Sequence, residues 1–211
     1  MAEDHVKQEI VRVSLERFLG QGIRKMTVQK LVEPLGMSTK TVYKYFSDKE
    51  DLLAHCLLLQ YQRNLDELEN MVRAHDNPVV VLASLWYRAA DLDFGVNRVF
   101  YHDLNHYYPD LQDSVLKKSR KRFTVTLLRV FEQGKSEGLF RRDILPEMIF
   151  DAAGILYASI TRTDSFKKFK ISPREIIRNT VETYFRGVCT EKGIRELERN
   201  YSLITKNQNS V

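Results

Sequence analysis

Hydroxyl, ammonium and phenol groups are concentrated between Ser38 and Glu50 of this chain, and no acidic residue occurs in this stretch before Asp48. Such groups donate hydrogen bonds to phosphate oxygens and reach the base edges in the major groove of DNA. Residues 21–49 as a whole contain six basic and two acidic residues, a net charge of +4. The segment therefore predicts a contact with double-stranded DNA.

The residues around this segment have the pattern of a helix-turn-helix. A helix beginning at Thr27, a tight turn at Gly36 and a second helix over residues 39–45 follow one another closely. In such a motif the first residues of the second helix enter the major groove. Lys40 is expected to donate to guanine, and Thr39 to reach a base or cover a thymine methyl group. Lys44 lies one turn beyond Lys40, on the same face of the helix.

Three residues are expected to hold phosphates. Thr27 places its hydroxyl among the free N–H groups of a helix N-terminus, where anions are favoured. The phenol of Tyr43 is long enough to reach a backbone oxygen of the DNA. Lys49 is a cation in the first turn of a helix, where the helix dipole opposes it by about 0.3–1 kcal/mol. A phosphate would offset this cost, and the alternative is screening by the neighbouring acids.

Helical spacing of apolar residues runs through nearly the whole chain, and no stretch has the alternation of a strand, so the fold class is predicted to be all-α. Two local signals bound the helices near the motif. Ser47 and Glu50 form an S-x-x-E capping box, and Pro34 is expected to end or kink the preceding helix near residues 30–33. The expected helices cover residues 3–20, 27–33, 39–45, 48–73, 79–93, 97–106, 111–136, 146–165 and 173–191.

The chain has 211 residues, a hydrophobic fraction of 43% and a formal net charge of +5, which suit a folded protein with a polyanionic partner. Its longest apolar run, residues 79–87, is far shorter than the ~20 residues that cross a bilayer. Cys56 and Cys189 have no metal-ligand spacing and favour a reducing compartment. The N-terminus lacks the pattern of a signal peptide. We therefore expect a cytoplasmic protein without membrane contact, metal or cofactor.

Aromatic residues cluster in the middle of the chain and favour a ligand cavity among helices. The candidate lining residues are Trp86, Tyr101, Phe123 and Tyr157, and the alternative for each is ordinary core packing. His102 and His106 have the i, i+4 spacing of metal-binding helices, which leaves a metal-dependent enzyme as an alternative function. No third ligand follows them in the sequence. A helical protein-interaction module that binds no small molecule is a further alternative.

Two long helices carry apolar stripes that are able to pair across a twofold axis as a four-helix bundle. The alternative is that each stripe packs within its own chain. The stripes consist of Phe123, Leu127, Val130 and Phe131 in one helix and of Ile176, Ile177, Thr180, Val181, Tyr184, Phe185 and Val188 in the last long helix.

Residues 6–54 resemble the tetracycline-repressor (TetR/AcrR) family. The resemblance rests on residues 18–22, on Thr27, on the turn at residues 35–38, and on the pattern Thr41-Val42-Tyr43-x-Tyr45-Phe46-x-x-Lys49-Glu50-x-Leu52-Leu53. The sequence departs from the family at Lys40, where glycine is frequent, so a contact special to this chain is expected there.

The resemblance implies a homodimeric, ligand-controlled transcription regulator, most often a repressor, that binds a palindromic operator and is not an enzyme. It implies a DNA-binding domain at residues 1–50 and an effector-binding and dimerisation domain at residues 51–192, with the dimer formed through the last long helices. Residues 193–211 are expected to be a polar tail. The expected DNA-binding residues are Thr27, Ser38, Thr39, Lys40, Thr41, Tyr43, Lys44, Tyr45 and Lys49. The effector, an unknown small molecule, is not specified by the sequence.

Overall fold

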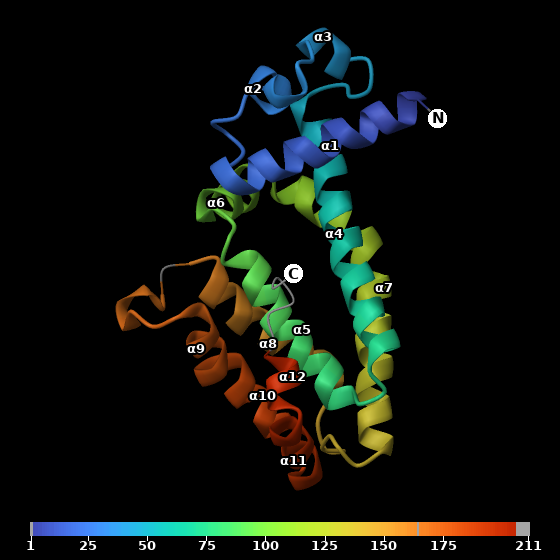
Figure 1. The fold of residues 1–211 in the computed structure, drawn as a ribbon, viewed down its shortest axis with the longest axis vertical. Coiled ribbons are helices and arrows are strands. Elements are labelled where there is room, and N and C mark those ends of the chain that lie inside the picture. The colour runs from blue at the N-terminus through green and yellow to red at the C-terminus, as the bar shows by residue number, and fades with distance from the viewer. Residues whose placement is uncertain (1, 164, 206–211) are drawn as a thin grey trace. The chain divides into compact units, whose positions relative to one another are not determined.

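The structure, a computed structural model, describes residues 2–163 and 165–205. Helices dominate it, and among the described residues the only β-type pairing is an isolated bridge between Phe140 and Cys189, which confirms the all-α prediction. In chain order the elements in Figure 1 are α1 (Ala2–Gln21), α2 (Val28–Val32), the 3-10 turn η1 (Glu33–Leu35), α3 (Thr39–Val42), α4 (Lys49–Ala74), α5 (Pro78–Asp93), α6 (Arg98–Tyr107), α7 (Pro109–Ser136), α8 (Pro146–Thr161), the 3-10 turn η2 (Lys167–Phe169), α9 (Pro173–Ile177), the π-helical segment η3 (Arg178–Glu182), α10 (Thr183–Val188), α11 (Glu191–Arg199) and α12 (Tyr201–Ile204).

Two compact units divide the chain. The first unit comprises Met1–Leu65 and Gly95–Lys121, and the second unit comprises Asp66–Phe94 and Arg122–Val211. Helices α4 and α7 each continue from one unit into the other. The segment of residues 1–50, which we expected to contact DNA, lies entirely within the first unit, together with α6 and the first part of α7.

The core of the first unit is formed by the apolar stripe of α1 against the start of α4. Ile10, Leu15 and Phe18 on α1 are completely buried, as are Leu52 and Cys56 on α4. The i, i+3, i+4 spacing predicted this stripe, and burial of such side chains contributes about 1.5–3 kcal/mol each. The core thus provides a fixed support for the short helices α2 and α3.

Helix α2 ends two residues before Pro34. Its last residue is Val32, and Pro34 lies in the 3-10 turn that follows. Gly36 then adopts a left-handed conformation with φ of 62° and turns the chain toward α3. The prediction that this helix ends near residues 30–33 is confirmed.

The predicted capping box at the start of α4 is wrong by one residue. Asp48, not Ser47, caps the helix, because its Oδ1 accepts from the amide of Asp51 at 2.8 Å. The Asp51 carboxylate in turn accepts from the amide of Ser47 at 2.9 Å, and Glu50 takes no part in these bonds. An aspartate caps a helix as well as a serine does, so both registers were compatible with the sequence.

The core of the second unit contains the two stripes that we expected to pair between chains. Leu127, Phe131, Ile177, Val181 and Phe185 are all buried within it. These five side chains are covered by their own chain, which favours the alternative that the stripes pack internally. Phe123, Thr180 and Tyr184 are only partly buried, and a dimer through the last long helices stays a prediction.

The last long helix is also not continuous. A π-helical segment, residues 178–182, separates α9 from α10, and the hydroxyl of Thr183 donates to the carbonyl of Arg178 at 3.1 Å. The hydroxyl of Thr180 donates to Ile176 O at 2.5 Å. Threonine hydroxyls that bond to preceding carbonyls disturb regular helices, and this gives a local reason for the wider turn.

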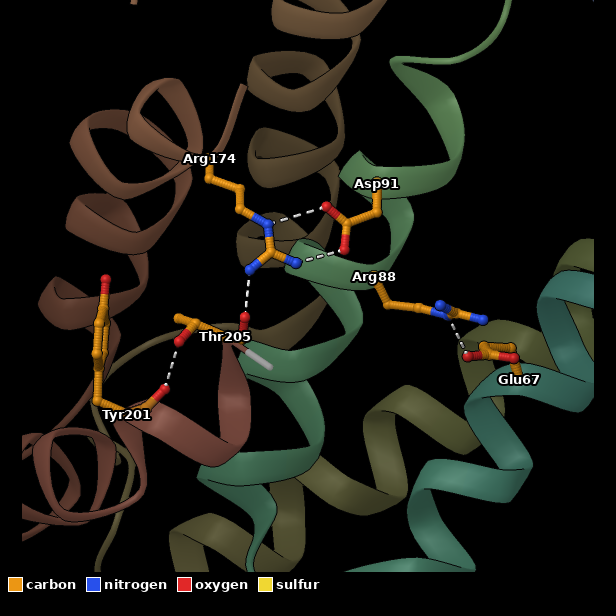
Figure 2. Close-up of polar contacts among 6 residues, drawn as sticks. All are labelled: Glu67, Arg88, Asp91, Arg174, Tyr201 and Thr205. Atoms are coloured by element: carbon orange, nitrogen blue, oxygen red, sulfur yellow. Dashed lines mark hydrogen bonds and ion pairs between the residues drawn. The ribbon is translucent and has the colours of Figure 1, made fainter. Parts of the chain in front are cut away.

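Residues 193–204, which we expected to belong to a polar tail, are folded. Gly193 lies inside α11, and Leu197 and Ile204 are buried in the core of the second unit. Figure 2 shows how the end of α12 is held: Arg174 forms a bidentate ion pair with Asp91 on α5, at 2.6 and 3.1 Å, and also donates to the carbonyl of Thr205. One guanidinium therefore joins α5, α9 and the chain after α12.

A second ion pair in Figure 2 joins α4 to α5 within the second unit, where Arg88 donates to Glu67 at 2.8 Å. Both side chains are less than a third exposed, so the pair is less screened than one on the open surface. Across the part of the chain that the structure describes, no helix is both long and apolar enough to span a membrane.

We expect Gly193→Ala to lower the free energy of unfolding by about 1–3 kcal/mol, the usual cost of overpacking. A Cβ at this position would lie 2.1 Å from the carbonyl oxygen of Leu139, a backbone atom that cannot move aside. Gly187→Ala is the matched control, since no atom lies within 4 Å of its added Cβ. It should raise stability by up to about 1 kcal/mol, as alanine does inside helices. Urea unfolding of both variants measures this, and equal stabilities would contradict the packing of α11.

Candidate nucleic-acid interface

Helices α2 and α3 lie next to each other in the first unit (Figure 1), and each begins with a hydroxyl cap. The Thr27 hydroxyl accepts from the amide of Lys30 at 3.3 Å, and the Ser38 hydroxyl accepts from the amide of Thr41 at 3.2 Å. Val42 is buried in the core of the same unit. Because α3 has only four residues, its caps and this buried contact hold it in place rather than its own helical propensity.

The opposite face of α3 is open to solvent. Lys40, Tyr43 and Lys44 are exposed, and the side chain of Tyr43 is 53% exposed despite its size. Thr39 is half-buried, and its carbonyl accepts from the amide of Tyr43 at 3.0 Å. Their spacing of one turn places these four residues on one side of the segment that begins with α3, and their contact with DNA stays a prediction. We call them the α3 surface.

The remaining residues of the segment serve mainly to build the motif. The hydroxyls of Ser38 and Thr41 bond to each other at 3.0 Å, so both are engaged in the cap of α3. Tyr45 is half-buried and packs against the core of the first unit. Direct contact of these three residues with DNA stays a prediction.

Four exposed cations lie within the helix-turn-helix segment or directly before it. Lys25 precedes α2, Lys30 lies within it, and Lys40 and Lys44 belong to the α3 surface; all four are exposed. Within residues 2–163 and 165–205, none of the four has an ion-pair partner. Their charge is therefore available to phosphates, which release counterions when lysines neutralise them.

Lys49 has an internal partner that the sequence did not reveal. Its Nζ donates to the carbonyl oxygen of Ile23 at 2.7 Å and lies 6.0 Å from the centre of the Phe18 ring. Burial lowers the pKa of Lys49, and the carboxylate of Asp103 acts in the opposite direction. The structure thus explains a cation in the first turn of α4 by a bond to the protein's own backbone, where we had expected a bond to a phosphate.

Asp103 holds the other side of the same loop. This residue of α6 is buried, and its Oδ2 accepts from the amides of Ile23 and Arg24 at 2.9 and 2.8 Å. Gly22 adopts φ of 85°, and a Cβ there would lie 2.7 Å from a methyl group of Val99. The loop between α1 and α2 is therefore fixed by Asp103 at its amides and by Lys49 at its carbonyl. We call these three partners, Asp103, Lys49 and residues 22–24, the loop clamp.

Asn97 joins the ends of two helices beside this clamp. Its Oδ1 accepts from the amide of Val99 at 3.0 Å and so caps α6. Its backbone amide donates to Leu19 O at 2.8 Å, and its side-chain amide donates to Gly20 O at 3.1 Å. Both carbonyl groups belong to the last turn of α1, where no amide of the same helix is available to donate to them. Sequence patterns gave no signal for Asn97 or Asp103, because their partners lie 77 or more residues away.

Of the four residues predicted to line a ligand cavity, three belong to the core of the second unit, where Trp86 and Tyr157 are in contact. Trp86 lines a small cavity in the second unit, with a volume of about 10 Å³. The ring of Tyr157 lies 5.6 Å from that of Trp86, and its hydroxyl donates to Asp93 at 3.0 Å. Phe123 packs against the core of the same unit. Tyr101 belongs to the core of the first unit, so its prediction as a lining residue of this cavity is wrong.

His102 and His106 lie on an exposed face of α6, with ring centres 5.8 Å apart. His106 also packs edge-on against Tyr107 at 4.6 Å, and Tyr107 accepts a hydrogen bond from Arg24 at 2.8 Å. Across the described part of the chain, no group of three histidine, cysteine or acidic side chains is arranged to hold a metal ion. The pair is accounted for by ring packing on the surface of α6.

The sequence of the chain is similar to those of known bacterial regulatory proteins. Residues 10–56 match the pattern of the bacterial regulatory proteins of the tetR family, a range that includes α2, α3 and Lys49. The chain is similar to the HTH-type transcriptional repressor KstR2 of Rhodococcus jostii (strain RHA1), with 22% identity over 151 residues that cover 68% of this chain and 72% of that protein.

Two solved structures have a similar fold. The ketosteroid transcriptional regulator KstR2 of Mycobacterium tuberculosis superposes with a TM-score of 0.60 and 17% identity, covering 88% of this chain and 95% of that chain. The reduced form of NemR from Escherichia coli superposes with a TM-score of 0.72 and 13% identity, covering 88% and 97%. Because these likenesses extend beyond α4, they concern the fold of both units.

We expect Asp103→Ala to lower the free energy of unfolding by at least about 2 kcal/mol. It leaves the amides of Ile23 and Arg24 without their acceptor, and an unsatisfied buried group costs about 1–3 kcal/mol. Asn105→Ala, an exposed change on the same helix, should stay within about 0.5 kcal/mol of the parent. Chemical denaturation gives the stabilities, and amide hydrogen exchange gives the protection of residues 23 and 24. Unchanged exchange at both amides in Asp103→Ala would show that the clamp does not hold the loop.

Proposed function

The chain belongs to the tetR family of bacterial regulatory proteins, and from that premise we propose that it represses transcription as a homodimer bound to a palindromic DNA site. Family membership makes it a DNA-binding transcriptional regulator and not an enzyme. The name of its relative KstR2 from Rhodococcus jostii, a transcriptional repressor, supports repression over activation. We further propose that a small molecule, bound in the second unit, releases it from DNA.

The observation that carries the proposal is the α3 surface with its unpaired cations. Lys40 on α3 and Tyr43 and Lys44 in the turn directly after it are exposed, while Val42 of the same helix is buried, and no acid interrupts residues 34–47. A helix presented in this way suits insertion into the major groove. Lys40 is placed to donate to guanine, while Tyr43 and Lys44 suit phosphate oxygens. Thr27, at the N-terminus of α2, is a further phosphate contact in this proposal.

The loop clamp gives Lys49 a positioning role in this proposal. Thr27 lies three residues after Arg24, whose amide Asp103 holds, so the clamp determines where α2 begins. Lys49 fixes the carbonyl of the same loop from the N-terminus of α4. A residue that orients the motif in this way affects affinity for every DNA sequence alike.

A palindromic site requires two copies of the chain, and α8 offers a surface for pairing them. Met148 and Ile155 lie two helical turns apart on one face of α8 and are 66% and 74% exposed. Leu145, which precedes the helix, is 64% exposed. Large apolar side chains that are exposed on one face of a helix favour an interface. The dimer that we propose therefore uses the outer face of α8, with the two α3 helices about 34–36 Å apart on DNA.

We expect Lys40→Ala to weaken binding to the preferred DNA by about 1–3 kcal/mol and to relax the sequence preference at one base pair. Lys44→Ala should weaken binding to all sequences and reduce the slope of log K against log salt by about one. Gel shifts over a salt series measure both effects. Lys117→Ala, which removes an exposed cation on α7, is the matched control. If Lys117→Ala weakens binding as much as Lys40→Ala, the α3 surface is not the interface.

We expect Ile155→Glu to convert the dimer into a monomer, because it places a charge in the middle of the apolar face of α8. Val125→Glu changes an apolar residue of α7 that is 47% exposed, and it should leave the dimer intact. Analytical ultracentrifugation distinguishes the two states. A monomeric Val125→Glu with a dimeric Ile155→Glu would place the interface elsewhere.

A further inference from the structure

Two exposed surfaces of the second unit have complementary chemistry, since one is basic, the other is acidic, and both carry large apolar side chains. We infer that the loop between α8 and α9, residues 165–171, docks onto the start of α8 in a second copy of this chain. The two α8 helices then run antiparallel across the twofold axis. This inference rests on the homodimer of the proposed function and names the segment that each subunit places on the other.

The loop is basic and presents apolar side chains to solvent. Residues 165–171 contain three lysines and no acid. Phe169 and Ile171 are 54% and 41% exposed, although both are large and apolar. Lys168 and Lys170 are exposed as well, and neither has an ion-pair partner in the part of the chain that the structure describes. Apolar and cationic groups that are exposed together in this way suit a partner surface that is apolar and acidic.

The loop is also held in a definite shape. Phe166 packs against the core of the second unit, and the centre of its ring lies 6.1 Å from that of Phe169. Lys170 has φ of 52°, and among the described residues it is the only residue other than glycine with a positive φ. In Figure 1 this stretch, drawn in orange next to α9, projects away from the other helices of the second unit. Disfavoured backbone conformations occur preferentially at binding sites, which fits a docking role for this projecting loop.

The start of α8 is acidic and apolar. Glu147 and Asp151 lie one helical turn apart, both are exposed, and residues 145–151 contain no base. Leu145 and Met148, in the same segment, are 64% and 66% exposed. Glu147 has no ion-pair partner among the described residues. This segment therefore complements the loop, because it offers acids to the lysines and apolar side chains to the exposed apolar residues.

Twofold symmetry brings the two surfaces together. An axis that crosses α8 midway between Met148 and Ile155 places the partner's Ile155 opposite Met148 and reverses the direction of the partner's helix. The C-terminal end of α8 then lies opposite the N-terminal end of the partner's α8. Residues 165–171 follow the C-terminal end of α8. They are therefore placed beside the partner's Leu145 and the partner's Glu147.

Charge opposes the parallel arrangement of the two helices. That arrangement would place the lysines of each loop beside the lysines of the other loop, and Glu147 beside its own copy. Like charges that meet at an interface weaken association, whereas the antiparallel arrangement pairs each basic loop with an acidic helix start. Because a twofold interface repeats every contact, both pairings form twice in the dimer.

Cross-linking between single-cysteine variants tests the arrangement. Leu145→Cys and Phe169→Cys are prepared as separate full-length proteins, mixed so that subunits exchange, and treated with a short bismaleimide. We expect cross-linked dimers from the mixture and none from either variant alone, because each position lies far from its own copy in the antiparallel arrangement. Cross-linking of Leu145→Cys with itself would overturn the inference, as would the absence of cross-links from the mixture.

The native thiols do not interfere with this measurement. Cys56 and Cys189 are buried, and burial raises the pKa of both, so they stay protonated and unreactive at neutral pH. Val125→Cys, at an exposed position on α7, is mixed with Phe169→Cys as the control for random collision. A cross-link in this control as strong as that between Leu145→Cys and Phe169→Cys would overturn the inference.

Charge exchange tests the complementarity of the two surfaces. Lys168→Glu combined with Lys170→Glu should raise the dissociation constant of the dimer at least about tenfold, a difference of 1.4 kcal/mol. Adding Glu147→Lys should reverse this effect, because it restores opposite charges across the interface. Asp110→Lys reverses an exposed acid on α7 in the first unit and is the matched control. Analytical ultracentrifugation measures the dissociation constants. If Glu147→Lys restores association no better than Asp110→Lys, the inference fails.

The same measurements separate this inference from the proposed function. A protein that is monomeric in ultracentrifugation contradicts both. If Ile155→Glu dissociates a dimer in which Leu145→Cys and Phe169→Cys do not cross-link, the homodimer stands and the docking of the loop is wrong. If the cross-link forms but gel shifts show one subunit on each DNA site, the docking stands and the palindromic site of the proposed function is wrong.

Discussion

A single buried carboxylate fixes the part of the first unit on which the DNA-binding motif depends. Asp103 accepts two backbone hydrogen bonds from the loop after α1, and Lys49 donates to the carbonyl between those amides. Hydrogen bonds to a charged group are worth about 1.5–3 kcal/mol each, more than bonds between neutral groups. The loop therefore has one conformation, and Gly22 is needed there because its φ is positive and Val99 lies against it. Thr27, the N-cap of α2, lies three residues beyond the loop clamp, so the loop clamp sets where α2 begins.

This arrangement separates the residues that build the motif from those that meet DNA. Helices of four and five residues have little stability of their own. The caps Thr27 and Ser38, together with Val42 in the core, provide what α2 and α3 lack. These supports do not involve the exposed side chains of Lys40 and Lys44, which have no ion-pair partner within the described residues. A surface of like charges would otherwise destabilise so short a helix.

Local signals in the sequence predicted the end of α2, whereas the next helix, expected over residues 39–45, ends at Val42. Pro34 ended a helix because it lacks an amide and clashes with the preceding turn, and Gly36 supplied the left-handed residue. These effects act over a few residues, so a single sequence contains them. The local sequence did not indicate whether Ser47 or Asp48 caps α4, because serine and aspartate are both good N-cap residues. The π-helical segment was missed for a similar reason, because Thr180 and Thr183 are compatible with a regular helix as well.

The sequence did not indicate hydrogen-bond partners that are far apart along the chain. The bond of Lys49 to Ile23 spans 26 positions, and that of Asp103 spans 80, so no spacing rule connects them. The sequence placed Lys49 correctly as an unusual cation at a helix N-terminus but could not name its partner. Polar composition after residue 193 concealed α11 and α12, in which Gly193, Leu197 and Ile204 are buried among many charged residues. Apolar stripes likewise do not reveal whether their partner is the same chain or a second copy.

Asn97 and Asp103 both attach α6 to residues 19–24 of the first unit, one at the first turn of α6 and the other further along it. Because α6 is bound at two points, even a small shift along its axis would weaken the hydrogen bonds of both Asn97 and Asp103. Any displacement of α6 would break the cap on α1 and the grip on the loop together. The position of α6 and the conformation of residues 19–24, directly before α2, are thus set by the same group of hydrogen bonds.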